Sequence, residues 1–251
     1  LDLTQDYLKS KNVEVDVENF NQMMKEQKER ARKNWKGTGD QEDQKKWFKI
    51  TENLSSTEFL GYEQTESESK ITSIVKSDNK TDQLNEGENG IIILNQTPFY
   101  GESGGQVGDI GTIVFEHNTF EVNDTTKLFG SFYLHHGKVK KGKFKIGDSV
   151  TATIDSYKRQ LIKCNHSSTH LLHASLRKIL GNHVSQKGSL VNSEKLRFDF
   201  SHNEPITSDN ITKIENFVKK EITANSQIEI KTIDHQKALD EGATALFGEK
   251  Y

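Results

Sequence analysis

Cysteine and long hydrophobic runs are nearly absent from this sequence. One cysteine among 251 residues excludes a disulfide framework, and with no signal peptide it indicates a reducing, cytoplasmic setting. No apolar stretch approaches the roughly 20 residues of a membrane-spanning helix, so a transmembrane protein and a membrane partner are excluded. The hydrophobic fraction of 32% still allows a sizeable core at this length.

An excess of positive charge is also lacking. The 34 Lys and Arg face 37 Asp and Glu, a formal net charge of −3, which excludes a chain that is basic throughout; we expect no DNA partner, and local basic patches remain open. The densest patch holds five lysines within eight residues and no acid: Lys138, Lys140, Lys141, Lys143 and Lys145. The residues that could extend it are Lys158, Arg159 and Lys163. Such a surface would contact an RNA phosphate backbone, and a solvated hairpin turn is the alternative.

The pattern predicts a helical connector over residues 1–50. Asp16 is a suitable N-cap, residues 16–36 contain no glycine or proline, and Gly37 ends the helix. Residues 37–44 have the composition of a mobile link. Because the chain begins with leucine and ends without a terminal signature, we expect a piece of a longer protein.

A small β-barrel is predicted over residues 51–154. Short β-rich runs are separated there by Asn, Asp, Gly and Lys turns, with almost no helical periodicity. These runs cover residues 57–62, 70–77, 90–95, 109–115, 131–136 and 148–154.

Residues 155–251 show a mixed pattern, so the fold class predicted for the whole chain is α+β. A long helix is expected from the N-cap Asp155 to a stop at Gly181. The elements expected after it are strands at 189–192 and 195–200, a helix at 208–224, a strand at 226–233 and a short helix at 235–241.

His166 and His170 are the sharpest candidate site. Residues four apart lie on one face of a helix, so both imidazoles can reach one zinc ion, and His173 extends the same face. Two polar helix residues with no metal remain the alternative. Ser167 stands where a zinc protease of the H-E-x-x-H type has its glutamate, which disfavours proteolysis. Cys164 points away from this face, and we expect it to be a small buried residue.

The glycine-rich run at 101–111 favours a backbone that approaches a ligand closely and offers N–H donors. It lacks the G-x-G-x-x-G spacing of a dinucleotide loop. Gly101 to Gly105 fit G-x-S-x-G, but the glycines that follow cannot form the helix that a serine hydrolase needs. Further along, Gln186 lies beside the expected pocket, where its amide could orient water or a substrate carbonyl.

Several long stretches resemble the editing region of the alanyl-tRNA synthetases. The residues that carry the resemblance are TPFYGESGGQVGDIG (97–111), NHSSTHLLHASLRKILGNHVSQKGSLV (165–191) and LRFDFSH (196–202). LDLTQDY at the start and ERARKNWKG (29–37) are similar to the segment leading into that region. The resemblance implies a translation-type barrel followed by the α+β editing domain that is shared with free-standing deacylases and, more distantly, with threonyl-tRNA synthetase.

The function implied is hydrolysis of seryl or glycyl esters wrongly attached to tRNA(Ala). In the family an H-x-x-x-H pair, here His166 and His170, joins a downstream C-x-x-x-H to hold zinc, and this chain ends before that second half. Gln186 would place the reacting groups. The resemblance assigns the amino-acid pocket to Thr97, Gly104, Gly105 and Gln106, with Thr97 as a partner for a serine hydroxyl.

The parent would be a ligase whose ATP site lies before Leu1. Two alternatives stay open: a non-catalytic tRNA-binding or structural module, and a free-standing deacylase.

Overall fold

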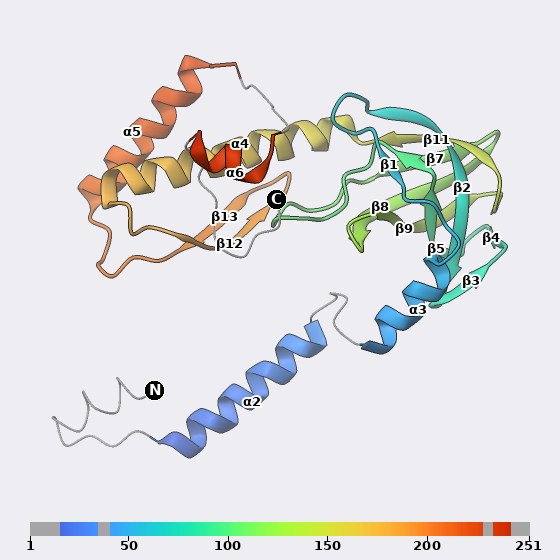
Figure 1. Ribbon diagram of the computed structural model, residues 1–251, viewed down its shortest axis with the longest axis horizontal. Coiled ribbons are helices and arrows are strands. Elements are labelled where there is room, and N and C mark those ends of the chain that lie inside the picture. Colours follow the sequence, from blue (N-terminus) through green and yellow to red (C-terminus); the bar gives the residue numbers. More distant parts are fainter. Residues whose placement is uncertain (1–15, 35–40, 228–232, 242–251) are drawn as a thin grey trace. The chain divides into compact units, whose positions relative to one another are not determined.

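The computed structural model describes residues 16–34, 41–227 and 233–241 (Figure 1). The chain divides into two compact units, residues 1–52 and residues 53–251. In the first unit, helix α2 (Val17–Asn34) begins where the sequence predicts, because the Asp16 carboxylate accepts a hydrogen bond from the Asn19 N–H at 2.9 Å. The expected stop at Gly37 lies outside the described residues.

Helix α3 (Gln41–Thr51) corrects the expectation of a mobile link over residues 37–44. Its first four residues belong to the predicted link and are helical. Residues 41–51 contain no Gly or Pro, and straight-chain Gln, Glu and Lys residues dominate. These residues have good helix propensity, which the polar composition of the segment concealed.

Six antiparallel strands close into the predicted barrel. Their order is β11-β7-β8-β9-β5-β2, and β2 pairs again with β11. The strands are β2 (Glu66–Lys76), β5 (Asn89–Leu94), β7 (Gly111–Phe115), β8 (Asn118–Leu128), β9 (Phe132–Lys141) and β11 (Ser149–Ile154). Strand β8 has no counterpart in the sequence prediction. Its exposed positions are polar, and the polar run from Asn123 to Lys127, with Thr125 buried, separates the apolar Phe120 and Val122 from Leu128.

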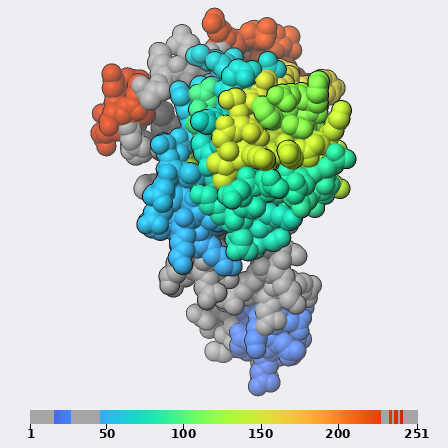
Figure 2. Space-filling model, turned by 90° about the vertical axis from the view of Figure 1, so that its right-hand side faces the viewer, coloured from blue at the N-terminus to red at the C-terminus, as the bar shows by residue number. Residues whose placement is uncertain are grey.

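Short strands flank the barrel. Strand β3 (Asn79–Thr81) pairs antiparallel with the end of β2. Strand β1 (Glu58–Phe59) runs parallel to β6 (Gln96–Thr97). Strand β4 (Gln83–Asn85) pairs with β10 (Lys143–Lys145), and the two segments lie side by side at the surface, green-cyan and yellow in Figure 2.

The barrel encloses the larger hydrophobic core. Its centre is fully buried and includes Ile74, Leu84, Ile92, Phe99, Ile113, Phe120, Val139 and Phe144. Burial of each such side chain contributes roughly 1.5–3 kcal/mol. The barrel is therefore stabilised chiefly by its own interior.

One histidine lies inside this core. His135 has no exposed surface, and its Nδ1 and Nε2 lie 2.9 Å from the Ile92 carbonyl and 2.8 Å from the Thr97 hydroxyl. Burial away from water lowers the pKa of His135 to about 4. The ring is therefore neutral at pH 7 and links two segments of the barrel.

The remaining elements are α4 (Ser156–Leu180), β12 (Gln186–Val191), β13 (Leu196–Phe200), α5 (Ser208–Ala224) and α6 (His235–Asp240). Helix α4 is the predicted long helix: Asp155 accepts a hydrogen bond from the Lys158 N–H at 2.9 Å, and Gly181 follows its end with φ of 117°. Helix α5 also matches its prediction. The strand expected at 226–233 falls largely outside the described residues.

Helix α4 packs against both the β12–β13 hairpin and α5 (Figure 1). The small core between them holds Leu176, Val184 and Ile214, with partly buried residues such as Leu172 and Phe198 around it. No helix among the described residues is long and apolar enough to cross a membrane.

Candidate functional site

A buried ion pair joins α4 to the loops at one end of the barrel. Arg159, on the first turn of α4, donates from Nε to both carboxylate oxygens of Asp109 at 2.9 Å. Its terminal nitrogens bond the carbonyls of Gly61 at 2.8 Å and Pro98 at 2.9 Å, and Nη2 also contacts the Asp109 carboxylate. The expectation that Arg159 joins a phosphate-facing surface is therefore wrong. The Arg159 guanidinium is buried and bonded to Asp109, Gly61 and Pro98, and these bonds hold the first turn of α4 against the loops.

The glycine-rich loop between Tyr100 and Asp109 lies along β12. The Val191 N–H donates to the Gly105 carbonyl at 2.8 Å, and the Val107 N–H donates to the Val191 carbonyl at 3.1 Å. Gly105 has φ of 82°, and a Cβ atom at this position would overlap Ser189. Glycine is thus required here by both the backbone conformation and the close approach of the strand.

His166 and His170 face each other on α4. Their Nε2 atoms are 3.1 Å apart, and the Nδ1 of His166 lies 2.6 Å from Oε1 of the buried Gln106. Because a carboxamide oxygen only accepts, this contact predicts that His166 carries its proton on Nδ1, with the Nε2 lone pair directed toward His170. Burial, and then the neighbouring charge of His170, lowers the pKa of His166. A lowered pKa favours the neutral imidazole, which is the form that binds a metal ion.

The geometry of this pair fits two ligands of one zinc ion. Tetrahedral bonds of about 2.0–2.1 Å place two ligand nitrogens about 3.3 Å apart, close to the observed separation. A hydrogen bond from the other ring nitrogen commonly orients such ligands, and Gln106 supplies it here. Among the described residues, no group of three or more His, Cys, Asp or Glu side chains is placed to hold a metal.

Among the described residues, neither Cys164 nor His173 joins the pair as a third metal ligand. Cys164 is exposed, which corrects the expectation of a buried residue. His173 lies against the Phe198 ring, with centroids 5.1 Å apart, and its Nε2 is buried without a hydrogen-bond partner among the described residues. Burial is the main cause that lowers the pKa of His173.

Gln186 is connected to the glycine-rich loop through Ser189. The Gln186 side-chain amide donates to Ser189 Oγ at 3.3 Å, and this hydroxyl donates to the Gly104 carbonyl at 3.3 Å. The sequence analysis missed Ser189, because only the packing of the loop on β12 distinguishes it from other serines. The structure thus brings the loop into contact with both the Gln186 strand and the His166 helix.

Thr97 lies elsewhere, in the barrel interior. It has no exposed surface, and its hydroxyl is 2.8 Å from His135 Nε2 and accepts a hydrogen bond from the Phe99 N–H at 3.2 Å. This position supports the start of the loop and offers no surface to a substrate. His135, the partner that holds it, was not singled out in the sequence.

The lysine group lies on β9 and β10. Two glutamate side chains from other segments, Glu121 and Glu86, lie close to it. Lys140 forms a 2.8 Å ion pair with Glu121, and the Gly142 N–H bonds Glu86 at 3.0 Å. The group with no acid in its own segment therefore has acidic neighbours in space. Lys138, Lys141 and Lys143 are the other members that could contact RNA.

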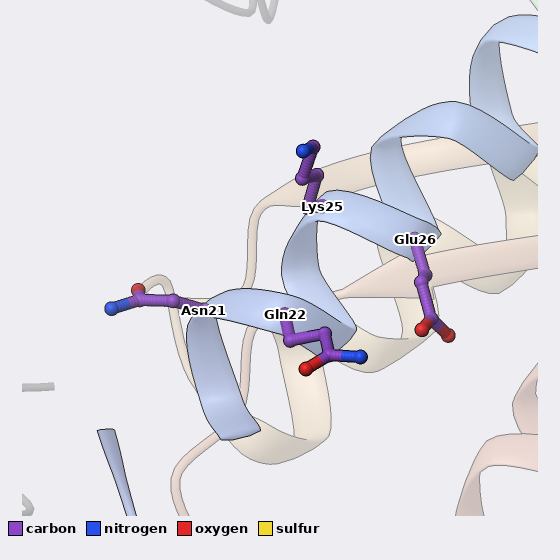
Figure 3. A pocket seen from close by; sticks show the side chains of 4 residues that line it. All are labelled: Asn21, Gln22, Lys25 and Glu26. Carbon is purple, nitrogen blue, oxygen red and sulfur yellow. The ribbon is translucent and has the colours of Figure 1, made fainter. Parts of the chain in front are cut away.

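A shallow depression on α2 carries no site. Figure 3 shows its lining side chains, Asn21, Gln22, Lys25 and Glu26, which spread outward from one exposed helix.

Comparisons with known proteins point to one family. The family described as tRNA synthetases class II (A) matches residues 1–158. Three proteins named alanine–tRNA ligase are each 44% identical to this chain over all of its 251 residues. They come from Rhodopseudomonas palustris, Nitrobacter winogradskyi and Mesorhizobium japonicum. The chain spans 28% of the length of each of these relatives.

Proposed function

Because this chain belongs to the class II tRNA synthetases (A), we propose that it acts on the aminoacylated 3′ end of tRNA(Ala) and hydrolyses wrongly attached serine or glycine. The observation that carries the proposal is the convergence of the His166 and His170 Nε2 atoms beside the glycine-rich loop. The parent protein is then an alanine–tRNA ligase, with its ATP-dependent reaction outside this segment.

His166 and His170 would hold a zinc ion. Bound there, zinc supplies a Lewis acid that polarises water or an ester carbonyl. Gln106 keeps the His166 proton on Nδ1, so that the Nε2 lone pair stays directed at the ion site. With two imidazoles as the only ligands found in the described part of the chain, we expect weak zinc binding by this segment.

The loop and β12 would position the substrate. Gly104 and Gly105 have no side chains to block the approach of an ester, and the Gln186 amide lies on the strand beside them. Serine differs from alanine by one hydroxyl and glycine by one methyl group, and a synthetic site discriminates such differences by only about 1–3 kcal/mol. A separate hydrolytic site is the usual solution to that limit.

Hydrolysis of Ser-tRNA(Ala) tests the proposal. We expect the chain supplied with zinc to release serine faster than tRNA alone, and His170→Asn or Gln186→Ala to reduce this rate at least tenfold. Ala-tRNA(Ala) is the substrate control, and Gln160→Ala on the exposed face of α4 is the matched variant. Equal rates with and without the protein would reject the proposal for this segment.

A non-catalytic tRNA-binding module is the second candidate, favoured by the pair of metal ligands standing alone in the described residues. It predicts binding of tRNA(Ala) with no release of serine at any zinc concentration.

A further inference from the structure

Four aromatic side chains form a cluster at the barrel end that carries the glycine-rich loop. The Phe59 ring is stacked on Tyr133, with centroids 5.3 Å apart, and it meets Tyr62 and Tyr100 edge to face at 5.0 and 6.2 Å. We call these four residues the aromatic cluster. Phe59, Tyr100 and Tyr133 are partly or largely buried, but Tyr62 is 78% exposed.

The cluster is neutral, and the cations Lys127 and Arg159 lie near it. Burial, and then the nearby Tyr62 and Tyr100 hydroxyls, raises the pKa of Tyr133 to about 12, so this hydroxyl keeps its proton at pH 7. Lys127 Nζ lies 5.4 Å from the centre of the Tyr133 ring. An uncharged aromatic cluster with a cation nearby suits a nucleotide, which has a flat base and a negatively charged phosphate.

The cluster is also continuous with the candidate site. The Tyr100 hydroxyl lies 3.4 Å from the carbonyl of Ser103, which immediately precedes Gly104. The Tyr100 N–H donates to Asp109 at 2.7 Å, and Asp109 is the partner of Arg159. Tyr100 is therefore the first residue of the loop whose Gln106 contacts His166.

We propose that the aromatic cluster stacks an unpaired base of the tRNA acceptor end while the neighbouring loop receives the aminoacyl ester. This inference rests on the proposed function and adds the binding site for the nucleic acid. Every base has a π face, so stacking on Tyr62 needs no particular sequence. The exposed carboxylates of Glu58 and Glu63 lie next to the cluster in sequence and oppose contact with a run of phosphates. The occupant is thus a single-stranded end, and a duplex is disfavoured.

The test uses two RNA hairpins with the acceptor-stem sequence, one with an unpaired ACCA end and one blunt. Tyr62→Ala should weaken binding of the ACCA hairpin about 5- to 150-fold, the range for loss of one base–aromatic stack. Tyr157→Ala is the matched control, because Tyr157 is 75% exposed on α4 and makes no ring contact with another described residue. It should change the dissociation constant less than twofold. Tyr62→Trp should bind the ACCA hairpin with quenching of its fluorescence.

Tyr62→Ala and Tyr157→Ala should both bind the blunt hairpin like the parent chain. Unchanged affinity of Tyr62→Ala for the ACCA hairpin, or an equal loss with the blunt one, would overturn base stacking. Quenching of Tyr62→Trp by AMP as strong as by the hairpin would instead make the cluster a free-nucleotide site and also overturn the inference. If the parent chain hydrolyses Ser-tRNA(Ala) while Tyr62→Ala binds normally, only the inference fails. A parent chain that neither binds nor hydrolyses contradicts both.

Discussion

The barrel and the α4 region differ in what holds them together. The barrel has a large interior of fully buried aliphatic and aromatic side chains, and its one buried histidine is bonded at both ring nitrogens. The α4 region has a smaller core around Leu176 and Ile214. The histidines of the candidate site lie on α4, yet two residues of a barrel loop hold this helix and its site: Gln106 contacts His166, and Asp109 pairs with Arg159 on the first turn. The part of this unit with the larger core therefore positions groups on the part with the smaller core.

Removing the Arg159 charge should have the largest effect on this arrangement. Arg159→Met leaves the Asp109 carboxylate buried without its partner, and breaking a buried pair in this way costs about 3–5 kcal/mol. Arg197→Met is the control, because the Arg197–Asp199 pair is exposed and is worth about 1 kcal/mol or less. Urea unfolding measures both variants. A cost for Arg159→Met no larger than that for Arg197→Met would mean that α4 does not depend on this junction.

Acid should destabilise the barrel through His135. A histidine with a pKa of about 4 when folded and about 6.5 when unfolded binds its proton more readily in the unfolded chain. Its stabilising contribution is present above pH 6.5 and is lost as the pH falls from there to 4, by about 3 kcal/mol in total. The free energy of unfolding at pH 7 and pH 4.5 should therefore differ less in His135→Gln than in the parent chain. Exposed His117→Asn is the control, and the same pH dependence in all three proteins would contradict this role for His135.

Loss of the Gln106 side chain should have a smaller effect, confined to the histidine pair. Gln106→Ala removes the acceptor that orients His166, and loss of such a partner commonly lowers metal affinity 10- to 100-fold. Competition with a chromophoric chelator measures the zinc affinity, with Gln160→Ala as the control. Equal zinc affinity in Gln106→Ala and the parent chain would separate the loop from the ion site.

Charge reversal in the lysine group should give the smallest change. Replacing Lys138, Lys141 and Lys143 by glutamate should weaken tRNA binding and make it less dependent on salt, since each phosphate contact releases counterions. Lys140 is left in place because it already pairs with Glu121. An identical salt dependence would identify the group as a solvated hairpin. Tyr62→Ala, by comparison, should weaken binding without changing the salt dependence.

Local signals in the sequence predicted helices α2, α4 and α5, although not α3. Asp155 and Gly181 bound α4 because capping and termination depend on adjacent residues. The same applies to the spacing of His166 and His170, which a helix places on one face.

Features that depend on packing between distant segments could not be predicted. The burial of Arg159 and the exposure of Cys164 follow from which side of α4 meets the barrel, and no local pattern specifies that side. Thr97 looked available within the loop motif, but its hydroxyl bonds a histidine 38 residues away. Strand β8 escaped notice because its pairing with β9 supplies the order that its own polar sequence does not indicate.

The protonation of His166 tests the central claim most directly, because the site depends on a neutral ring held by Gln106. Nitrogen-15 NMR of the histidine rings distinguishes the two tautomers at pH 7. We predict that His166 carries its proton on Nδ1 and that adding zinc shifts the Nε2 resonances of His166 and His170 together. A proton on Nε2 of His166, or zinc addition that leaves both Nε2 resonances unchanged, would contradict the account.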